Sequence, residues 1–356
     1  MRRLLEELML ELLRTYSPTG SEEAAVRRYI SFVNGLHIVD AHTDHAGNAI
    51  IDHGNGGRWV LLAGHIDTVA GELPVDYEGG VFRGRGAVDA KGPLVAITVG
   101  ALEALKHVDD RCRVTVVALV GEEGRSPGAR ALMSVLNSGR AKPTAVVVGE
   151  PSGCDGVVIG YRGTIKLKLK CLGSGGHSSN PSEGVSAIEE LMRLWLDLKS
   201  LLGSIPNLSL SMNYIKGGMP FSVIPRECDA LVDIRVPVGL GLDAVKGKLV
   251  ELLSNGYERC VYSIDDETPP VKVSINAPIV RSLVRAIIRN NLKPTPVLKL
   301  GTSDMNLLAG LTSNIVSYGP GRSELSHTDR EEISIEELEL GARIYRDTIT
   351  DYCSNP

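Results

Sequence analysis

Three short apolar runs of this sequence each lead, through a glycine, into side chains that bind metal ions. These segments are Ala63-Gly64-His65-Ile66-Asp67, Val120-Gly121-Glu122-Glu123 and Val148-Gly149-Glu150. Asp89 and His327 supply a further carboxylate and a second imidazole. Imidazole and carboxylate ligands suit borderline divalent metals, and the set is large enough for two ions that share a bridging carboxylate. The pattern therefore predicts a centre of two metal ions, zinc or cobalt.

Isolated histidines and carboxylates carry much less information, because most of them are solvated or paired for structural reasons. We keep that interpretation for five other histidines: His37, His42, His45, His53 and His107. The pair Glu122 and Glu123 differs, since adjacent carboxylates at the end of a buried strand are costly unless cations neutralise them.

The apolar runs that precede these residues must position them. Runs at 60–63, 114–120, 145–148 and 315–316 are continuously apolar and rich in β-branched residues. Such runs are typical of strands buried on both faces of a largely parallel sheet. Predicted helices at about 92–107 and 128–138 separate them, which indicates an α/β domain with helices flanking the sheet. Open sheets of this kind hold ligands at the carboxyl ends of their strands, so we expect the ligands to meet there.

A different pattern begins at Thr164, where polar and apolar residues alternate as on a strand with one exposed face. Lys166, Lys168 and Lys170 take that face. Predicted helices at 184–201 and 243–254 and strands at 208–215 and 227–236 complete a β-α-β-β-α-β unit, an α+β pattern of the ferredoxin-like kind. We therefore predict a catalytic domain of residues 1–162 and 271–356, interrupted by an inserted domain of residues 163–270.

Composition excludes several classes of protein. A chain of 356 residues exceeds the size of one ordinary hydrophobic core, which agrees with two domains. With 43% apolar and 23% charged residues, and no apolar run near 18 residues, it is neither disordered nor membrane-inserted. A net charge of −5 gives no electrostatic footprint for nucleic acid or an anionic membrane. Glu6, Glu7 and Glu11 interrupt what would be a signal peptide, so we expect a cytoplasmic protein.

The six cysteines form no C-x-x-C pair, so neither a thiolate zinc site nor a thioredoxin-like redox motif is supported. The sequence contains no Gln. Depletion of thermolabile amides is a tendency of hyperthermophiles, in which intracellular disulfides do occur. We therefore expect a thermophilic protein, and pairing among the cysteines stays open.

In order and spacing these motifs resemble the M20 metallopeptidase family, which includes acetylornithine deacetylases, succinyl-diaminopimelate desuccinylases, aminoacylases and glutamate carboxypeptidases. The resemblance covers nearly the whole chain. Its matching stretches are Gly64 to Val69, Gly84 to Gly92, Gly121 to Gly124, Gly149 to Pro151, Gly175 to Ser179 and His327.

The resemblance implies a role for each residue of the metal centre. One ion would be bound by His65, Asp89 and Glu150, and the other by Asp89, Glu123 and His327. Glu122 would be the general base of an amide hydrolysis, and Asp67 would orient His65. The fold implied is a zinc-peptidase-like catalytic domain with a lid or dimerisation domain inserted into it.

For the substrate, the resemblance implies contributions from the inserted domain. His177 would stabilise the oxyanion in the active site of a second subunit, which requires a homodimer; alternatively, it is only a turn residue in a Gly/Ser-rich loop. Arg162, Asn213 and Arg235 match positions that hold a substrate carboxylate. Ser303 lies in a loop that resembles the one facing the leaving group.

Within the family, the chain is most similar to hydrolases that release lysine or ornithine from the γ-glutamyl end of the acidic carrier protein LysW. The alternatives are an N-acetylornithine deacetylase or succinyl-diaminopimelate desuccinylase, a carboxypeptidase or aminoacylase, and a non-catalytic metal-binding homologue. An acidic carrier would give the three-lysine face a role in docking, whereas an ordinary solvated strand face is the competing interpretation.

Overall fold

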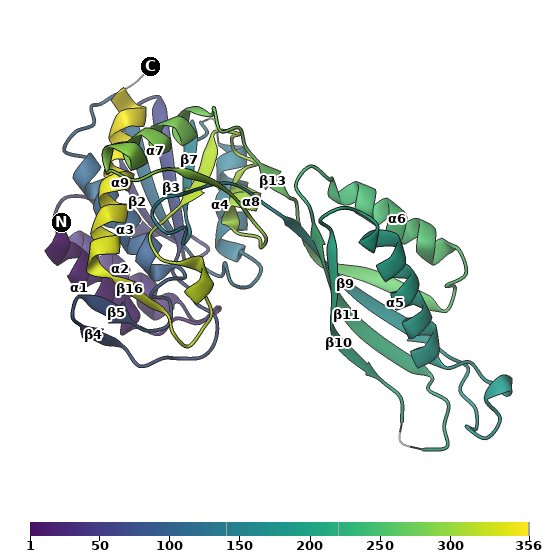
Figure 1. The fold of residues 1–356 in the computed structure, drawn as a ribbon. Coiled ribbons are helices and arrows are strands. Elements are labelled where there is room, and N and C mark those ends of the chain that lie inside the picture. The colour runs from purple at the N-terminus through teal and green to yellow at the C-terminus, as the bar shows by residue number, and fades with distance from the viewer. Residues whose placement is uncertain (140, 220, 355–356) are drawn as a thin grey trace. The chain divides into compact units, whose positions relative to one another are not determined.

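The computed structural model describes residues 1–139, 141–219 and 221–354 of the chain. Contacts between residues divide the chain into two compact units (Figure 1). The first comprises Met1–Gly160, Val273–Leu298 and the residues from Ser303 onward, and the second comprises Tyr161–Lys272 and Lys299–Thr302. The chain thus passes between the units near residues 160, 272, 298 and 302. The short segment Lys299–Thr302, which we placed in the catalytic domain, belongs instead to the second unit.

In the first unit, four parallel strands form the centre of a mixed sheet, as the apolar runs predicted. Their order is β6 (Cys112–Leu119), β3 (Arg58–His65), β7 (Ala145–Gly149) and β15 (Ile315–Tyr318). Their residues are buried almost without exception, because both faces of the sheet are covered. Antiparallel strands extend the sheet with β2 (Ala49–His53) and β1 (Ala41–Thr43) beyond β6, and β8 (Gly156–Tyr161) beyond β15. Strands β13 (Val271–Lys272) and β14 (Thr295–Lys299) lie where the chain passes between the units.

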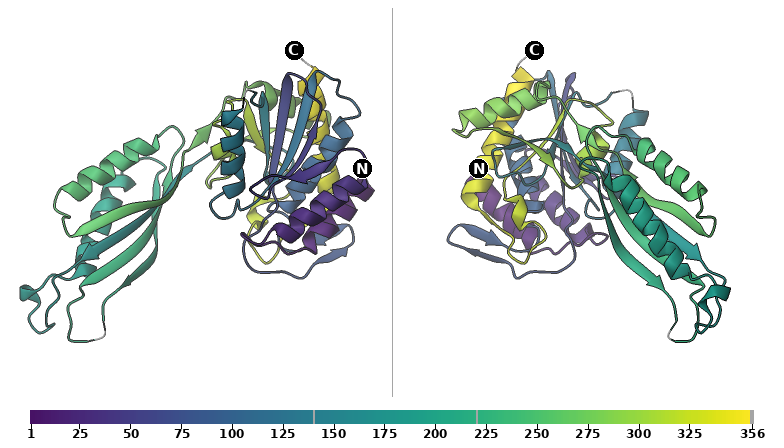
Figure 2. Two further views of the ribbon diagram at one scale, coloured as in Figure 1. Left: turned by 180° about the vertical axis from the view of Figure 1, so that it is seen from behind. Right: turned by 45° about the vertical axis from the view of Figure 1, so that its right-hand side comes forward.

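Helices flank this sheet (Figure 2). They are α1 (Arg2–Leu13), α2 (Glu23–Gly35), α3 (Lys91–Ala104), α4 (Pro127–Ser138), α7 (Pro278–Arg289), α8 (Asp304–Leu308) and α9 (Ile335–Ser354). Helices α3 and α9 pack closely: a Cβ at Gly100 would lie 2.6 Å from the carbonyl oxygen of Ala342, so only glycine fits there. None of the helices in the described part of the chain combines the length and the hydrophobicity needed to cross a lipid bilayer.

A small antiparallel sheet lies beside the main one in the first unit. Its order is β16 (Glu332–Ser334), β5 (Val81–Arg83) and β4 (Asp76–Glu78). This pairing holds the segment that follows His327 against the segment that precedes Asp89. Two segments more than 200 residues apart in sequence are therefore neighbours.

The second unit has the predicted β-α-β-β-α-β order. Its elements are β9 (Gly163–Leu172), α5 (Ala187–Gly203), β10 (Ser209–Gly217), β11 (Glu227–Val236), α6 (Leu242–Ser254) and β12 (Cys260–Thr268), with a 3₁₀ turn at Pro181–Glu183. The antiparallel sheet runs β10-β11-β9-β12, and the two helices bury its inner face around Leu167, Leu191 and Val232. Lys166, Lys168 and Lys170 alternate with the buried residues of β9, as predicted.

Four of the six cysteines are paired. Cys112 of β6 bonds to Cys353 near the end of α9, and Cys171 of β9 bonds to Cys260 of β12. Cys154 and Cys228 are buried free thiols. The structure therefore answers the question of pairing that the sequence left open.

Candidate metal centre

The carboxyl ends of three neighbouring parallel strands lie at one edge of the sheet, with predicted ligands on each. His65 is the last residue of β3, and Glu150 directly follows β7. Glu122 and Glu123 lie just after β6, beyond Gly121. Gly121 has φ +75°, and a Cβ there would lie 2.6 Å from the ring of Pro127, so the turn that presents the two glutamates requires glycine.

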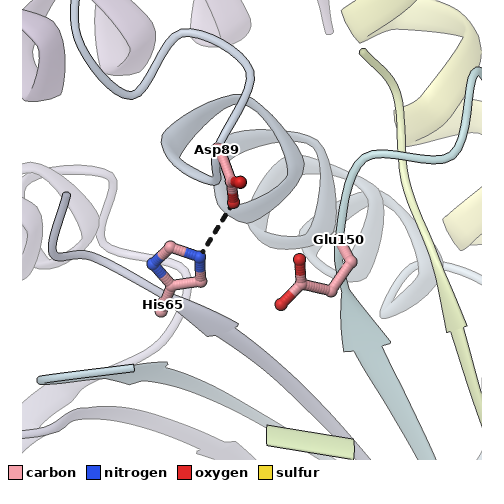
Figure 3. Close-up of side chains that lie close together, drawn as sticks. All are labelled: His65, Asp89 and Glu150. Atoms are coloured by element: carbon pink, nitrogen blue, oxygen red, sulfur yellow. Dashed lines mark hydrogen bonds and ion pairs between the residues drawn. The ribbon is translucent and has the colours of Figure 1, made fainter. Parts of the chain in front are cut away.

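Two loops complete the cluster. Asp89 lies just before α3, and Figure 3 shows its carboxylate directed at the ring of His65, with Glu150 beside them. The distance from His65 Nε2 to Asp89 Oδ1 is 3.2 Å. His327 Nε2 lies 2.7 Å from Glu123 Oε1 and 3.3 Å from Asp89 Oδ2. Asp89 therefore contacts both imidazoles, one through each of its oxygens.

The possible ligand atoms form compact groups. Those of His65, Asp89 and Glu150 lie within 4.8 Å of one another, and so do those of Asp89, Glu123 and His327. A further group of the same size contains His65, Glu122 and Glu123. Asp89 is common to the first two groups, which is the arrangement that a bridging carboxylate requires.

Asp67 is completely buried and connects the strand ends. Its backbone oxygen lies 3.0 Å from His65 Nδ1, and its carboxylate lies 3.4 Å from the same nitrogen. The same carboxylate accepts the backbone N–H groups of Glu122 at 3.0 Å and Glu123 at 3.1 Å. Thr19 donates a further hydrogen bond of 2.8 Å. Asp67 thus fixes the ring of His65 and the turn that carries the two glutamates.

Burial shifts the pKa values of the clustered acids. It raises the pKa of Glu150 to about 8, and the charge of Asp89 adds to the shift. It also raises the pKa of Glu122 well above its ordinary value. For Asp89, hydrogen bonds from His327 and His65 outweigh burial and lower the pKa. Carboxylates that resist ionising together, placed beside two imidazoles, form a donor set that divalent cations would neutralise, so these residues fit a metal centre.

One buried acid near the cluster belongs to the loop of Ser303 and was given no role of its own from the sequence. Asp304 is 2% exposed, and its Oδ1 has no hydrogen-bond partner within the described ranges. Burial raises its pKa to about 6. The preceding residue, Ser303, which we expected at the substrate, is 5% exposed and caps helix α8 by accepting the N–H of Met305 at 3.2 Å.

In the second unit, two of the three predicted carboxylate-binding residues lie together. Arg162 donates to Ser209 Oγ at 3.1 Å, and Ser209 is the strand partner of Arg235. Burial lowers the pKa of Arg162, and the charge of Arg235 adds to the shift. Arg235 is also paired with Asp233 at 2.8 Å. Asn213 lies four residues from Ser209 along β10, about 13 Å at the rise of a strand.

His177 lies in an exposed loop of the second unit. Its Nδ1 accepts the backbone N–H of Ser179 at 3.1 Å and lies 2.8 Å from the Ser179 hydroxyl. A backbone N–H can only donate, so in the neutral ring the proton must be on Nε2. His177 therefore presents a hydrogen-bond donor to solvent.

The sequence profile of "Peptidase family M20/M25/M40" matches residues 61–351, and the chain belongs to this family. Its parallel strands end in clustered imidazole and carboxylate groups, and with the family match this makes the protein a metal-dependent hydrolase. The resemblance stated from the motifs is thus confirmed.

Curated relatives match over almost their entire length. A protein of Aeropyrum pernix is 40% identical over 99% of this chain and 97% of its own. Proteins of Sulfurisphaera tokodaii and Saccharolobus solfataricus are 36% and 35% identical, over 99% and 96% of this chain and 96% and 93% of theirs. These two are named LysW-lysine/LysW-ornithine hydrolase.

Solved structures share the fold at lower sequence identity. Aminopeptidase PepT from Bacillus cereus superposes with a TM-score of 0.83 at 20% identity, covering 99% of both chains. The M20 family metallo-carboxypeptidase Sso-CP2 from Sulfolobus solfataricus gives 0.79 at 16% identity, over 98% of this chain and 99% of that one. The predicted fold class is confirmed.

Proposed function

We propose that this enzyme hydrolyses the amide that links an amino acid to the C-terminal γ-glutamyl group of the carrier protein LysW. The products would be lysine or ornithine, for lysine and arginine biosynthesis in the cytoplasm. Two full-length relatives bearing the name LysW-lysine/LysW-ornithine hydrolase support this substrate. The observation that carries the chemistry is a pair of ligand groups with Asp89 in common.

We assign one divalent ion to the group formed by His65, Asp89 and Glu150, and the second to the group formed by Asp89, Glu123 and His327. Zinc and cobalt both suit this donor set. When bound, such ions act as Lewis acids that polarise the amide carbonyl and make water more acidic. Asp67 holds His65 in the orientation in which Nε2 faces the cluster.

Glu122 is the proposed proton carrier. It lies within the cluster but belongs to neither of the two assigned ligand groups, so its carboxylate can accept the proton of the attacking water. The same group would then deliver that proton to the leaving amine.

We assign the remaining roles to the second unit. The Nε2–H of His177 would donate to the oxyanion in the site of a second copy of the chain, which makes the working enzyme a homodimer. Arg162 and Arg235, which share Ser209 as a neighbour, would bind the α-carboxylate of the substrate. Asn213 and Ser303 stay as candidate substrate contacts.

A side-by-side assay tests this proposal. Purified enzyme loaded with Zn²⁺ or Co²⁺ is given carrier-linked lysine, acetylornithine and succinyl-diaminopimelate. We expect kcat/KM to be higher for carrier-linked lysine than for either small acylated substrate. Equal or greater activity on either small acylated substrate would contradict the proposed substrate, although not the metal chemistry.

Removal of the metal tests that chemistry separately. The enzyme should lose activity after exhaustive chelation, and Zn²⁺ or Co²⁺ should restore it, because the chain supplies imidazole and carboxylate ligands but no thiolate ligand here. Metal content is measured in parallel. Full activity at a metal content near zero would refute the two-metal mechanism.

A further inference from the structure

A buried ion pair next to the metal centre has no part in the mechanism above. Glu331 is 2% exposed and Arg85 is 6% exposed, and their Oε1 and Nη1 atoms are 2.7 Å apart. The other oxygen of Glu331 accepts backbone N–H groups of Gly86 at 3.0 Å, Val88 at 3.2 Å and Asp89 at 3.4 Å. One carboxylate therefore gathers the loop that ends at the shared ligand Asp89.

Arg85 makes the corresponding contacts on the other side. Its Nη1 also donates to the carbonyl oxygen of Thr328 at 2.9 Å, next to the ligand His327. Its Nε donates to the carbonyl oxygen of Gly71 at 2.8 Å. The pair thus joins the loop that carries Asp89 to the loop that carries His327.

The Asp89 loop has little room to adjust on its own. Gly86 has φ +88°, and a Cβ there would lie 2.7 Å from Thr68 Cγ2, one residue beyond Asp67. The loop is therefore held on one side by Thr68, which follows the end of β3, and on the other side by Glu331. A shift of Glu331 would be transmitted to the backbone of Asp89.

Stability alone is a weak reason to bury this pair. Desolvating a carboxylate and a guanidinium offsets most of their attraction, so a well-packed apolar pair of similar size is often as stable. What an apolar pair could not do is accept three backbone N–H groups and donate to two carbonyl oxygens. The contacts of Arg85 and Glu331 to backbone groups therefore fix the shape of the loops that carry Asp89 and His327.

We propose that Arg85 and Glu331 are positioning residues that hold Asp89 and His327 at the separation needed to bind the second metal ion. This inference rests on the proposed assignment of that ion to Asp89, Glu123 and His327. Partners that orient metal ligands typically account for 10- to 100-fold in metal affinity.

The test compares Glu331→Gln with Glu332→Gln. Glu332 is the next residue, its side chain is 39% exposed, and it pairs with Arg83 at 3.1 Å, so the control removes the same charge from an ion pair outside the centre. Metal-free proteins are titrated with Zn²⁺ in competition with a chromophoric chelator, which gives the affinity for each ion. Circular dichroism checks that each metal-free variant is folded.

We expect Glu331→Gln to weaken binding of at least one ion by about tenfold or more and to lower kcat more than it raises KM. We expect Glu332→Gln to bind both ions with nearly the affinity of the unmodified enzyme, because its partly exposed partner Arg83 is not one of the assigned metal ligands. Equal affinities in the two variants would overturn the proposal. If the unmodified enzyme itself binds fewer than two ions, the metal assignment fails instead, which is a distinguishable result.

A second variant covers the case in which Glu331→Gln does not fold. Arg85→Lys keeps the buried charge, but an ammonium cannot reach the acceptors of a planar guanidinium with the same geometry. We expect the folded Arg85→Lys protein to show the same loss of metal affinity. Folded Arg85→Lys protein with unchanged affinity for both ions would overturn the proposal.

Discussion

Glu122 and Glu123 are neighbours in sequence but differ in their surroundings. Glu123 Oε1 contacts His327 at 2.7 Å, so it is held as a ligand would be. Burial raises the pKa of Glu122 well above its ordinary value. Glu122 belongs only to the third group, whereas Glu123 also belongs to the group of Asp89 and His327. This difference separates the proposed proton carrier from the proposed ligand.

Replacing Glu122 with Gln should keep both metal ions and lower kcat by about 10²–10⁴ or more, because it removes a proton acceptor and no assigned ligand. The measurements are kcat and the metal content of the purified protein. Glu123→Gln is the matched control and should lose metal. The opposite outcome, with metal lost only in the Glu122 variant, would mean that the two roles are exchanged.

At the scale of elements, helices α7 and α9 are joined by one buried carboxylate. The side chain of Asp351 in α9 is 1% exposed and accepts hydrogen bonds from Arg285 and from Arg289, the latter at 2.8 Å. Burial alone would raise the pKa of Asp351, but the hydrogen bonds from Arg285 and others lower it. The arginines are partly exposed, so the stabilisation is smaller than that of a fully buried pair.

Asp351→Asn should lower the free energy of unfolding at pH 7 by about 1–3 kcal/mol. Because the folded-state pKa lies below the unfolded value, this contribution is present above about pH 4 and disappears as the pH falls through the folded pKa. Denaturant unfolding at several pH values measures it. Asp347→Asn, one turn earlier in α9, is the control; an equal loss in both variants would show that Asp351 has no special role.

The lysine face of β9 is not an isolated positive strip. Lys170 pairs with Glu227 at 2.6 Å, Lys168 pairs with Asp265, and Lys166 lies 3.7 Å from Asp266. Each lysine thus has an acid beside it, and little net charge is left to steer an acidic partner. The structure therefore favours the interpretation that the three-lysine face is an ordinary solvated strand face rather than a docking surface.

Changing Lys166, Lys168 and Lys170 to Ser together with their acidic partners to Asn or Gln leaves the net charge of this face unchanged. This variant should keep kcat/KM for carrier-linked lysine within about fivefold, because exposed ion pairs contribute little. The slope of kcat/KM against salt concentration should also be unchanged. A small acyl-lysine substrate serves as the control. If the slope of kcat/KM against salt concentration fell for the carrier-linked substrate alone, the three-lysine face would be a docking surface after all.

Continuously apolar strands could be predicted because a strand covered on both faces tolerates little else. The half-exposed strands β1, β4 and β16 were not predicted, since they are three residues long and contain polar side chains. Their pairing depends on distant segments: β16 pairs with β5, roughly 250 residues earlier. Strand order and disulfide partners depend on the same long-range contacts.

The candidate ligands could be predicted because metal chemistry limits which side chains serve. Glu331 was missed, and Asp304 was noted only as part of the loop of Ser303, for the opposite reason. A glutamate that accepts backbone N–H groups looks like any other glutamate until the loop it binds is known. Asp304 stands out only through its burial, which the sequence does not reveal.

At the scale of the whole molecule, the Cys112–Cys353 disulfide closes a loop of 241 residues and ties the C-terminal helix to the central sheet. Long loops gain most from a cross-link in the chain-entropy picture. We expect Cys112→Ser/Cys353→Ser to lower the free energy of unfolding by about 2–4 kcal/mol. Thermal and denaturant unfolding measure this. The Cys154→Ser variant, which removes a free thiol, is the control, and an effect no larger than its own would contradict the expectation.

The chain leaves the first unit after residue 160 and returns to it at residue 273, and these two positions are neighbours. The N–H of Val273 donates to the carbonyl oxygen of Ile159 at 2.8 Å, and a Cβ at Gly163 would lie 2.6 Å from the carbonyl oxygen of Thr268. An insertion whose ends already meet can gain or lose length without pulling on the strands that it interrupts. Over evolutionary time, one part of the gene can therefore vary freely in size while the metal-bearing strands keep their register.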